Sequence, residues 1–391
     1  MAVNDLNFAQ ISAVVKEVAE QASGQKVLGP VDTSSFTTVA QLALKSGYDN
    51  VMNAISQILS RTIYSSRAYR GEMLSLMGTA ERWGNHVRKI ASIDQDPVND
   101  LGQVLTDEQS IDQYIIRKPE VLQTNYYGFT TYEDYVTRFR EQMDTAFSGP
   151  AEFSRFWGMI MQEITNKHTQ WKESMLKGVL NNFIGGKLLG DTGNVVHLVT
   201  EYNAASGAGV TSTTVLQPAN IRPFVQWMSA RMALASDYLE NRSVLYHVNI
   251  TNKALKRHTP KDRQKVFMLS KYSTLFRNMV ETDLFNPQYL SKFAAVEEVR
   301  FWQNDQDPSA IDVTPVYLAA SGALVNSETA ATTEVLVGVI IDDEAVMACP
   351  KVESLDVTPM NARGRYWNLW WNNQYRYWND FTENGIVFLL D

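Results

Sequence analysis

The residues that could perform chemistry are few, and their spacing does not favour a catalytic site. Three adjacent carboxylates at 342–344 follow an apolar segment, where acidic side chains can bind a metal ion or transfer protons, although such a run is more typical of a solvated turn. The Gly-Gly-Lys sequence at 185–187 lacks the serine or threonine and the upstream glycine of a phosphate-binding loop. The five histidines show no zinc-site spacing, and the single cysteine, Cys349, has no histidine nearby in the sequence. We therefore expect no enzyme activity, no cofactor and no metal site.

Composition indicates a folded protein whose main task is not to bind nucleic acid. The 391 residues are 45% hydrophobic and 20% charged, which suits two or three structural units around an apolar core. A net charge of −8 disfavours a protein that depends on contacts with phosphates. The sequence shows no signal peptide and no apolar run near the roughly 20 residues that a membrane-spanning helix needs. We expect synthesis in a reducing cytoplasm and no contact with a membrane.

Apolar periodicity predicts one long helix that begins at Pro150, because proline is favoured at the first helical position. Trp157 and Trp171 belong to the apolar stripe that follows at steps of mostly three or four residues. Gly185, with the glycine after it, is expected to end the helix in a left-handed cap. The predicted helix at 150–184 would be about 50 Å long. A helix of that length is typical of a structural spine or a coiled coil.

The segment at 366–381 (YWNLWWNNQYRYWNDF) is half aromatic and predicts a long strand. Alternation places Trp367, Trp371 and Tyr377 on one face of it. Packing of this face against the long helix is the favoured interpretation, because large aromatic side chains bury much area at low entropic cost. The apolar run at 386–390 should then be buried core. The alternative is a strip that stacks on sugar rings, which would make the chain a carbohydrate-binding module.

Three further regions have recognisable patterns. Apolar periodicity within residues 1–60 predicts two amphipathic helical stretches, which would pack on another part of the chain or on a partner. Strand-like ends around the polar stretch at 94–112 predict an extended hairpin that leaves the core. A mixed unit follows the long helix, with a helix at 221–234, a β-rich segment at 244–250 and a buried strand at 335–341.

The tail from Pro359 to Leu390 resembles the major capsid proteins of short-tailed, phi-29-like bacteriophages. The residues that carry the resemblance form an N-x-R-G-x-Y-W-N motif at Asn361, Arg363, Gly364, Tyr366, Trp367 and Asn368. The segment from Pro119 through Gly128 and into the helix after Pro150 resembles the same family more weakly. Together these matches cover about a third of the chain, and the remainder matches by element order only.

The resemblance implies an α+β chain with the Hong Kong 97 (HK-97)-like capsid fold. The implied parts are an N-terminal arm at 1–60, an extended β-hairpin loop at 61–123, a peripheral domain at 124–216 that contains the spine helix 150–184, an axial domain at 217–345 and returning peripheral-domain strands at 346–391. The residues implied to serve structure and assembly are Pro150, Trp157, Trp171, Gly185, Arg363, Gly364, Tyr366, Trp367 and Trp371.

The resemblance also implies the function. Such a chain is the major capsid (shell) protein of a tailed double-stranded DNA bacteriophage and self-assembles as hexamers and pentamers into an icosahedral capsid that encloses the genome. Its implied partners are other copies of itself, a scaffolding protein and a portal, with the DNA enclosed without sequence-specific binding. Assembly would take place in the host bacterial cytoplasm, and the product is the virion capsid. An encapsulin-type nanocompartment shell, which shares the fold but encloses enzymes, is the alternative.

Overall fold

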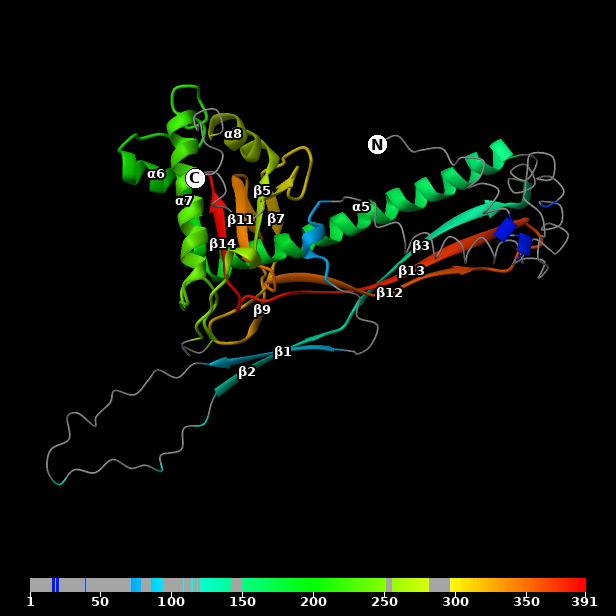
Figure 1. Cartoon of the computed structure of the whole chain (residues 1–391), viewed down its shortest axis with the longest axis horizontal. Helices are drawn as coiled ribbons and strands as arrows, with labels where there is room; N and C mark the ends of the chain where they lie inside the picture. The colour runs from blue at the N-terminus through cyan, green and yellow to red at the C-terminus, as the bar shows by residue number, and fades with distance from the viewer. Residues whose placement is uncertain are drawn as a thin grey trace.

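A computed structural model of the chain has an elongated body from which a two-stranded hairpin projects (Figure 1). It describes residues 72–78, 86–93, 120–141, 150–250, 255–280 and 296–391 with isolated positions elsewhere, and the side chains of 150–163 and 278–280 are excepted. The helical arm expected at 1–60 and the polar stretch expected at 94–112 lie outside these ranges. Within the described part, none of the helices has the length and apolar character needed to cross a membrane.

A five-stranded mixed sheet forms the core of the globular end. Its order is β4 (Val195–His197), β14 (Gly385–Leu389), β11 (Leu336–Asp342), β5 (Gln264–Leu269) and β6 (Val296–Val299). The central strand β11 pairs antiparallel with both neighbours, while the two outer pairings are parallel. Every residue of β11 and β14 is buried, as continuous apolar strands in a covered sheet require.

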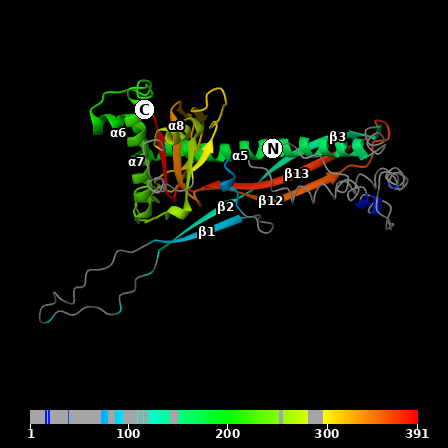
Figure 2. The ribbon, with the colours of Figure 1, turned by 45° about the horizontal axis from the view of Figure 1, so that its top comes forward.

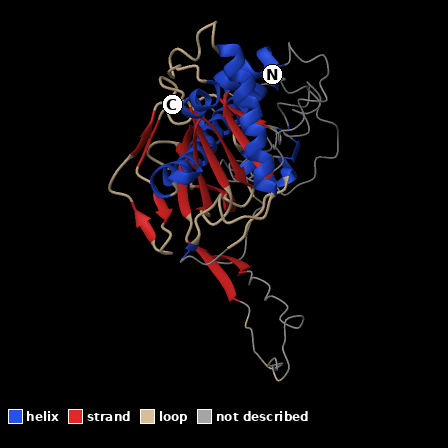
Figure 3. Cartoon of the chain, turned by 90° about the vertical axis from the view of Figure 1, so that its left-hand side faces the viewer, coloured by secondary structure: helices blue, strands red, loops and turns tan. Residues whose placement is uncertain are grey.

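Three helices lie around this sheet (Figure 3). They are α6 (Leu198–Ser206), α7 (Ile221–Glu240) and α8 (Ser270–Val280). The buried strand predicted at 335–341 is confirmed as β11, and the helix predicted from 221 extends six residues further, to Glu240. Since β4 and β14 come from outside 217–345, that stretch does not complete its own sheet.

The elongated half of the body consists of one helix along one three-stranded antiparallel sheet. Helix α5 (Pro150–Gly190) has 41 residues, about 60 Å at 1.5 Å per residue. The sheet has the order β12 (Val346–Val357), β13 (Tyr366–Asn379) and β3 (Thr130–Phe139). Figures 1 and 2 show α5 running beside these strands and entering the globular end.

The expected end of the helix at Gly185 is wrong, because α5 continues through it to Gly190. The glycines here permit close packing. A Cβ on Gly185 would lie 2.6 Å from Val313 Cγ2, and one on Gly186 would lie 2.5 Å from Phe381 Cε1. Tertiary neighbours therefore explain the Gly-Gly pair that the sequence suggests as a stop signal.

Two small sheets and three 3-10 turns complete the described elements. β7 (Ile311–Val313) pairs with β10 (Ala331–Thr333), and β8 (Val316–Leu318) pairs with β9 (Leu324–Asn326). The 3-10 turns are η1 (Leu74–Leu76), η3 (Thr192–Asn194) and η5 (Lys261–Arg263).

The β-rich segment at 244–250 forms no strand: residues 244–247 are bends, and 248–249 have no regular secondary structure. Their backbone bonds go singly to a neighbouring loop: Val248 N donates to Phe381 O at 2.8 Å, and Gly385 N donates to Tyr246 O at 2.9 Å. The β-rich composition therefore serves a loop that fits against the start of β14.

The projecting hairpin consists of β1 (His86–Ile93) and β2 (Glu120–Tyr127), paired antiparallel from His86–Tyr127 to Ile93–Glu120. β2 ends four residues beyond the expected loop end at 123. The chain then turns through Gly128, whose φ of 87° favours glycine, and enters β3. Figure 2 shows the hairpin pointing away from both halves of the body.

Candidate functional site: the hairpin, its base and the aromatic sheet

The Asn-x-Arg-Gly part of the motif forms the turn between β12 and β13. Asn361 Oδ1 accepts hydrogen bonds from the backbone N–H groups of Arg363 at 3.1 Å and Gly364 at 3.0 Å. Arg365 is left-handed, with a φ of 50°, and its N–H donates to Asn361 O at 2.8 Å. An asparagine that bonds to its own following backbone is a standard turn former. The motif thus sets the start of the aromatic strand, and it leaves Arg363 and Arg365 exposed at the turn.

The aromatic strand β13 buries the face that alternation predicts. Trp367 is 0% and Trp371 is 3% exposed, and Tyr375 is also fully buried. The ring of Trp171 on α5 lies 5.0 Å from that of Tyr375, between centroids, and 3.8 Å from that of Tyr132 on β3. The sugar-stacking strip is therefore wrong, because two of the three rings that it needs are inside the helix–sheet interface.

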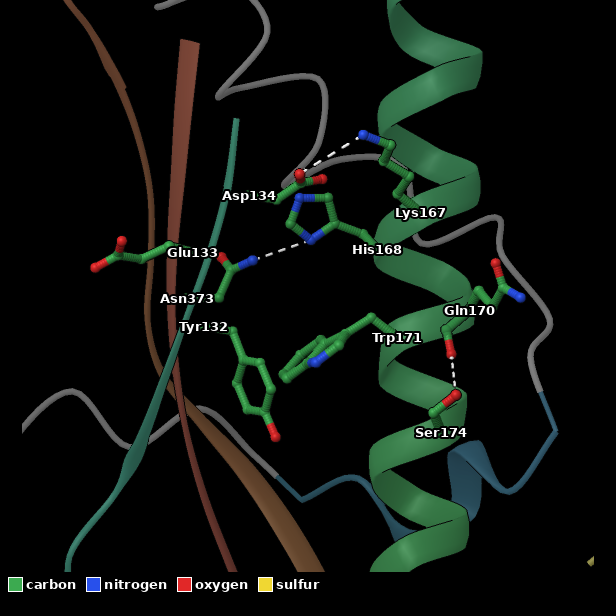
Figure 4. A pocket seen from close by; sticks show the side chains of 9 residues that line it. All are labelled: Tyr132, Glu133, Asp134, Lys167, His168, Gln170, Trp171, Ser174 and Asn373. Atoms are coloured by element: carbon green, nitrogen blue, oxygen red, sulfur yellow. Dashed lines mark hydrogen bonds and ion pairs between the residues drawn. The ribbon is translucent and has the colours of Figure 1, made fainter. Parts of the chain in front are cut away.

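A pocket of about 370 Å³ lies between α5 and β3 near this interface (Figure 4). His168 Nδ1 lies 3.0 Å from the amide nitrogen of Asn373, from which it can accept a hydrogen bond, and burial lowers the pKa of His168. Lys167 pairs with Asp134 at 3.6 Å across the opening. A neutral imidazole held by an amide in an aromatic interface is a packing element.

The carboxylates at 342–344 divide into two environments. Asp342 is buried and accepts hydrogen bonds from Thr259 Oγ1 at 2.7 Å and from the Glu344 N–H at 2.9 Å. Burial raises the pKa of Asp342 to about 6. Asp343 and Glu344 are partly exposed and pair with Arg263 at 2.8 and 2.5 Å. The solvated-turn interpretation therefore fails for Asp342 alone, and no cluster of His, Cys, Asp or Glu in the described ranges suits a metal ion.

The inward face of the hairpin contacts the body through Tyr126 and Lys89. The ring of Tyr126 stacks on Trp378, with centroids 5.4 Å apart and an interplanar angle of 23°. Lys89 Nζ lies 2.8 Å from Asp380 Oδ2, 2.5 Å from Glu383 Oε1 and 3.1 Å from Glu344 Oε2. Beside these contacts, β2, α5 and β8 line a groove of about 1120 Å³.

The charges at this base influence one another strongly. Burial acts to lower the pKa of Lys89, but Asp380 and Glu383 outweigh it and the pKa is raised. Burial acts to raise the pKa of Asp380, but Lys89 outweighs it and the pKa is lowered. Both groups are therefore ionised at neutral pH and hold one another in place.

The outward face of the hairpin carries three exposed apolar side chains among polar ones. Ile90 is 61%, Val121 58% and Tyr127 72% exposed, and the pairing register places all three on the same side. A two-stranded hairpin is marginal by itself, and exposed apolar groups gathered on one element mark an interaction surface. This face can therefore bind another surface by apolar contact.

The structure brings some predicted site residues together and separates others. Arg363 and Gly364 lie in the β12–β13 turn, and Tyr366 and Trp367 begin β13 directly after it. Trp171 faces the buried side of the same strand, which also carries Trp371. Pro150 begins α5, and Trp157 lies where side chains are not described. Sequence analysis missed Lys89 and Asp380, since their 291-residue separation leaves no local signal.

Comparisons with known proteins give one family and one fold. The model of the Phi29-like phage major capsid protein family matches residues 11–389. The solved "Capsid structure of Staphylococcus phage Andhra" is similar with a TM-score of 0.55 and 10% identity, covering 82% of this chain and 84% of that chain. The "Structure of head fiber and inner core protein gp22 of native bacteriophage P68" follows at 0.54 and 11%, covering 82% and 85%. No curated protein sequence matches significantly.

Proposed function

The chain belongs to the Phi29-like phage major capsid protein family, and on this premise we propose that its copies join as hexamers and pentamers into an icosahedral shell that encloses double-stranded DNA. It is a shell-forming major capsid protein of a tailed phage, with the α+β, HK-97-like fold expected from the sequence. Identical subunits joined head to tail close into rings when the rotation between them permits. Hexamers and pentamers are rings of this kind.

The observation that supports the proposal best is the outward face of the hairpin. Its three apolar side chains, Ile90, Val121 and Tyr127, are more than half exposed on an element that projects from the body (Figure 1). Burying them on a second copy would gain free energy at about 25 cal/mol per Å² of apolar surface. The hairpin therefore serves best as a contact between subunits, with its outward face laid on a neighbouring copy.

The other parts receive roles by the same correspondence. Residues 1–60 act as the N-terminal arm and 61–123 as the extended loop. The peripheral domain at 124–216, with the returning strands at 346–391, forms the wall of the shell. The axial domain at 217–345 surrounds the local symmetry axes. The length of α5 and of the sheet beside it supports the wall role, because such a layer spans much of one subunit.

The proposed partners are other copies, a scaffolding protein and a portal. DNA is enclosed without sequence-specific binding, which the net charge of −8 supports because a strongly basic lining would hold DNA through its phosphates. Assembly takes place in the host bacterial cytoplasm. The chain acts without catalysis, and the engagement of Asp342 with Thr259 and of Asp343 with Arg263 supports a structural role for these carboxylates.

Electron microscopy of the purified chain, alone and with lysate of its source, tests the proposal. We expect closed shells or ring-shaped capsomers of uniform size. A variant with Ile90→Ser, Val121→Ser and Tyr127→Ser should stay unassembled, while Ile90→Leu, Val121→Ile and Tyr127→Phe should assemble normally. Equal assembly of both triple variants would remove the hairpin from the interface. Shells that contain enzymes in place of DNA would favour the nanocompartment alternative.

A further inference from the structure

Lys89 lies in a cage formed by the carboxylates of Asp380, Glu383 and Glu344, and contacts within the body fix the positions of these groups. Asp380 Oδ1 accepts hydrogen bonds from the N–H of Thr382 at 2.9 Å and from its hydroxyl at 2.6 Å, which leaves Oδ2 for Lys89. The Asp380 N–H donates to Ala345 O at 2.7 Å, so the β13–β14 loop is bonded to the β11–β12 turn that carries Glu344. The cage is therefore a rigid receptor that spans two turns of the body.

Two of the three cage acids have a cation other than Lys89. Arg263 Nη2 lies 2.5 Å from Glu344 Oε1. Arg257 Nη2 lies 3.0 Å from Glu383 Oε1, and Arg257 Nε donates to Thr382 O at 3.2 Å. Asp380 has Thr382 and Lys89 as its partners but no such arginine among the contacts of the described part. Lys89 is thus the group whose charge balances the buried Asp380.

The hairpin joins β3 through Gly128, whose carbonyl oxygen accepts a hydrogen bond from Nε of the buried Arg376 at 3.1 Å, so one end of the hairpin is held by the body. Gly128 joins β2 to β3 with a φ of 87°, and a Cβ placed on it would meet nothing within 4 Å. The strand direction changes at this residue, in a backbone conformation that glycine adopts at low cost. The groove of about 1120 Å³ beside β2 leaves that side of the hairpin without continuous packing against the body. The direction of the hairpin therefore depends on a few specific contacts.

We propose that Lys89 is a positioning residue, which sets the direction in which the hairpin leaves the body by locking it to the Asp380–Glu383–Glu344 cage about a pivot at Gly128. The stacked pair of Tyr126 and Trp378 supports the same direction from the neighbouring strand. The consequence for assembly rests on the proposed function, since a fixed direction matters only when a second copy receives the hairpin. Lys89 presets that direction before the subunits meet, which lowers the entropic cost of their association.

The adjacent residue provides a matched control. Arg88 and Lys89 follow one another on β1 and carry the same charge, but Arg88 points to the outward face opposite Asn125, whereas Lys89 points inward opposite Thr124. Lys89→Met and Arg88→Met therefore remove the same charge from the same strand. Only the first change opens the cage, and Lys89→Arg keeps a cation in it.

The test measures hairpin direction in the unassembled chain by electron–electron spin distances. Labels are placed at Ser92→Cys on the exposed side of β1 and at Ala230→Cys on the exposed side of α7, in a Cys349→Ala background. We expect Lys89→Met to make the distance distribution about twofold broader. Arg88→Met and Lys89→Arg should leave it unchanged. An unchanged distribution in Lys89→Met, or equal broadening in Arg88→Met, overturns the proposal.

A second variant separates positioning from folding. Lys89→Met leaves Asp380 as a buried, unbalanced carboxylate, which is strongly destabilising. Lys89→Met with Asp380→Asn removes that charge, and Glu383 keeps Arg257. This double variant should melt near the wild-type temperature and still show the broad distribution, and a narrow one overturns the proposal. Assembly is measured separately on unlabelled chains: a broad distribution with normal assembly supports positioning by Lys89 and contradicts the inferred benefit of a preset direction for assembly, while the triple-serine variant tests the hairpin contact itself.

Discussion

Gly185 of α5 lies so close to Val313 of β7 that a Cβ at position 185 would be 2.6 Å from Val313 Cγ2. Pro315 and Ala331 line the same contact at 3.3 and 3.4 Å. The helix crosses the β7–β10 pair at a point where a side chain does not fit. Gly185 is therefore required for the close approach of helix and sheet.

Gly185→Ala should therefore destabilise the chain although alanine favours a helix. Overpacking of a well-packed contact costs about 1–3 kcal/mol, which exceeds the helical gain of up to about 1 kcal/mol. Gly178 lies in the same helix with nothing within 4 Å of its Cβ position, so Gly178→Ala is the matched control and should stabilise. Urea unfolding of the unassembled chain measures both. A gain in Gly185→Ala equal to that in Gly178→Ala would contradict the close contact.

Local patterns predicted the elements of this fold well and the contacts between them poorly. The long helix, the buried strand β11 and the aromatic strand follow from periodicity, because each buries a continuous face. The Gly-Gly pair is ambiguous in the sequence, because two glycines suit both a helix cap and a close helix–sheet contact, and only tertiary neighbours distinguish the two. The sequence does not predict the pairing of Lys89 with Asp380 for a related reason, because only the fold brings the two side chains together.

Asn361→Ala should weaken the β12–β13 turn. The change removes the acceptor of the Arg363 and Gly364 N–H groups, each worth about 1 kcal/mol, so we expect a loss of about 1–2 kcal/mol in unfolding free energy. Asn361→Asp keeps an oxygen at the same place and should cost little. Chemical denaturation distinguishes the two variants. Equal losses would show that the side-chain oxygen does not stabilise the turn.

Trp171→Ala should loosen α5 from the sheet. The Trp171 ring lies between Tyr132 of β3 and Tyr375 of β13, and its truncation leaves a space that neighbouring rings fill only in part. We expect a cost of about 2–4 kcal/mol, with Trp171→Phe at less than half of it because the aromatic contacts are partly kept. The near-ultraviolet circular dichroism of the interface should fall in the alanine variant while helical content is retained. An alanine variant as stable as wild type would place the ring outside the core interface.

Asp342 should make the chain less stable as the pH rises from about 4 to 6. Burial raises the pKa of Asp342 in the folded chain to about 6 from an ordinary 3.8, so between these values the folded state binds a proton that the unfolded state has released. Above about pH 6 the carboxylate is ionised in both states, and its contribution stays at the lower level. Asp342→Asn removes this titration. As the pH rises, the unfolding free energy of the variant should therefore increase relative to that of wild type, by up to about 3 kcal/mol at 1.36 kcal/mol per pKa unit.

The neighbouring Asp343 supplies a control of opposite sign. Burial acts to raise the pKa of Asp343, but the Arg263 guanidinium outweighs it, and the pKa is lowered. Its contribution to stability is present above the unfolded pKa and is lost as the pH falls through the folded one. The unfolding free energy of Asp343→Asn should therefore decrease relative to that of wild type as the pH rises. Unfolding of wild type and Asp342→Asn in urea at pH 4 and pH 7 gives the first difference, and a pH-independent gap between them would show that Asp342 titrates normally. The Asp343 contribution changes below the ordinary pKa of 3.8, so Asp343→Asn is compared with wild type at pH 7 and at the lowest pH at which the chain stays folded.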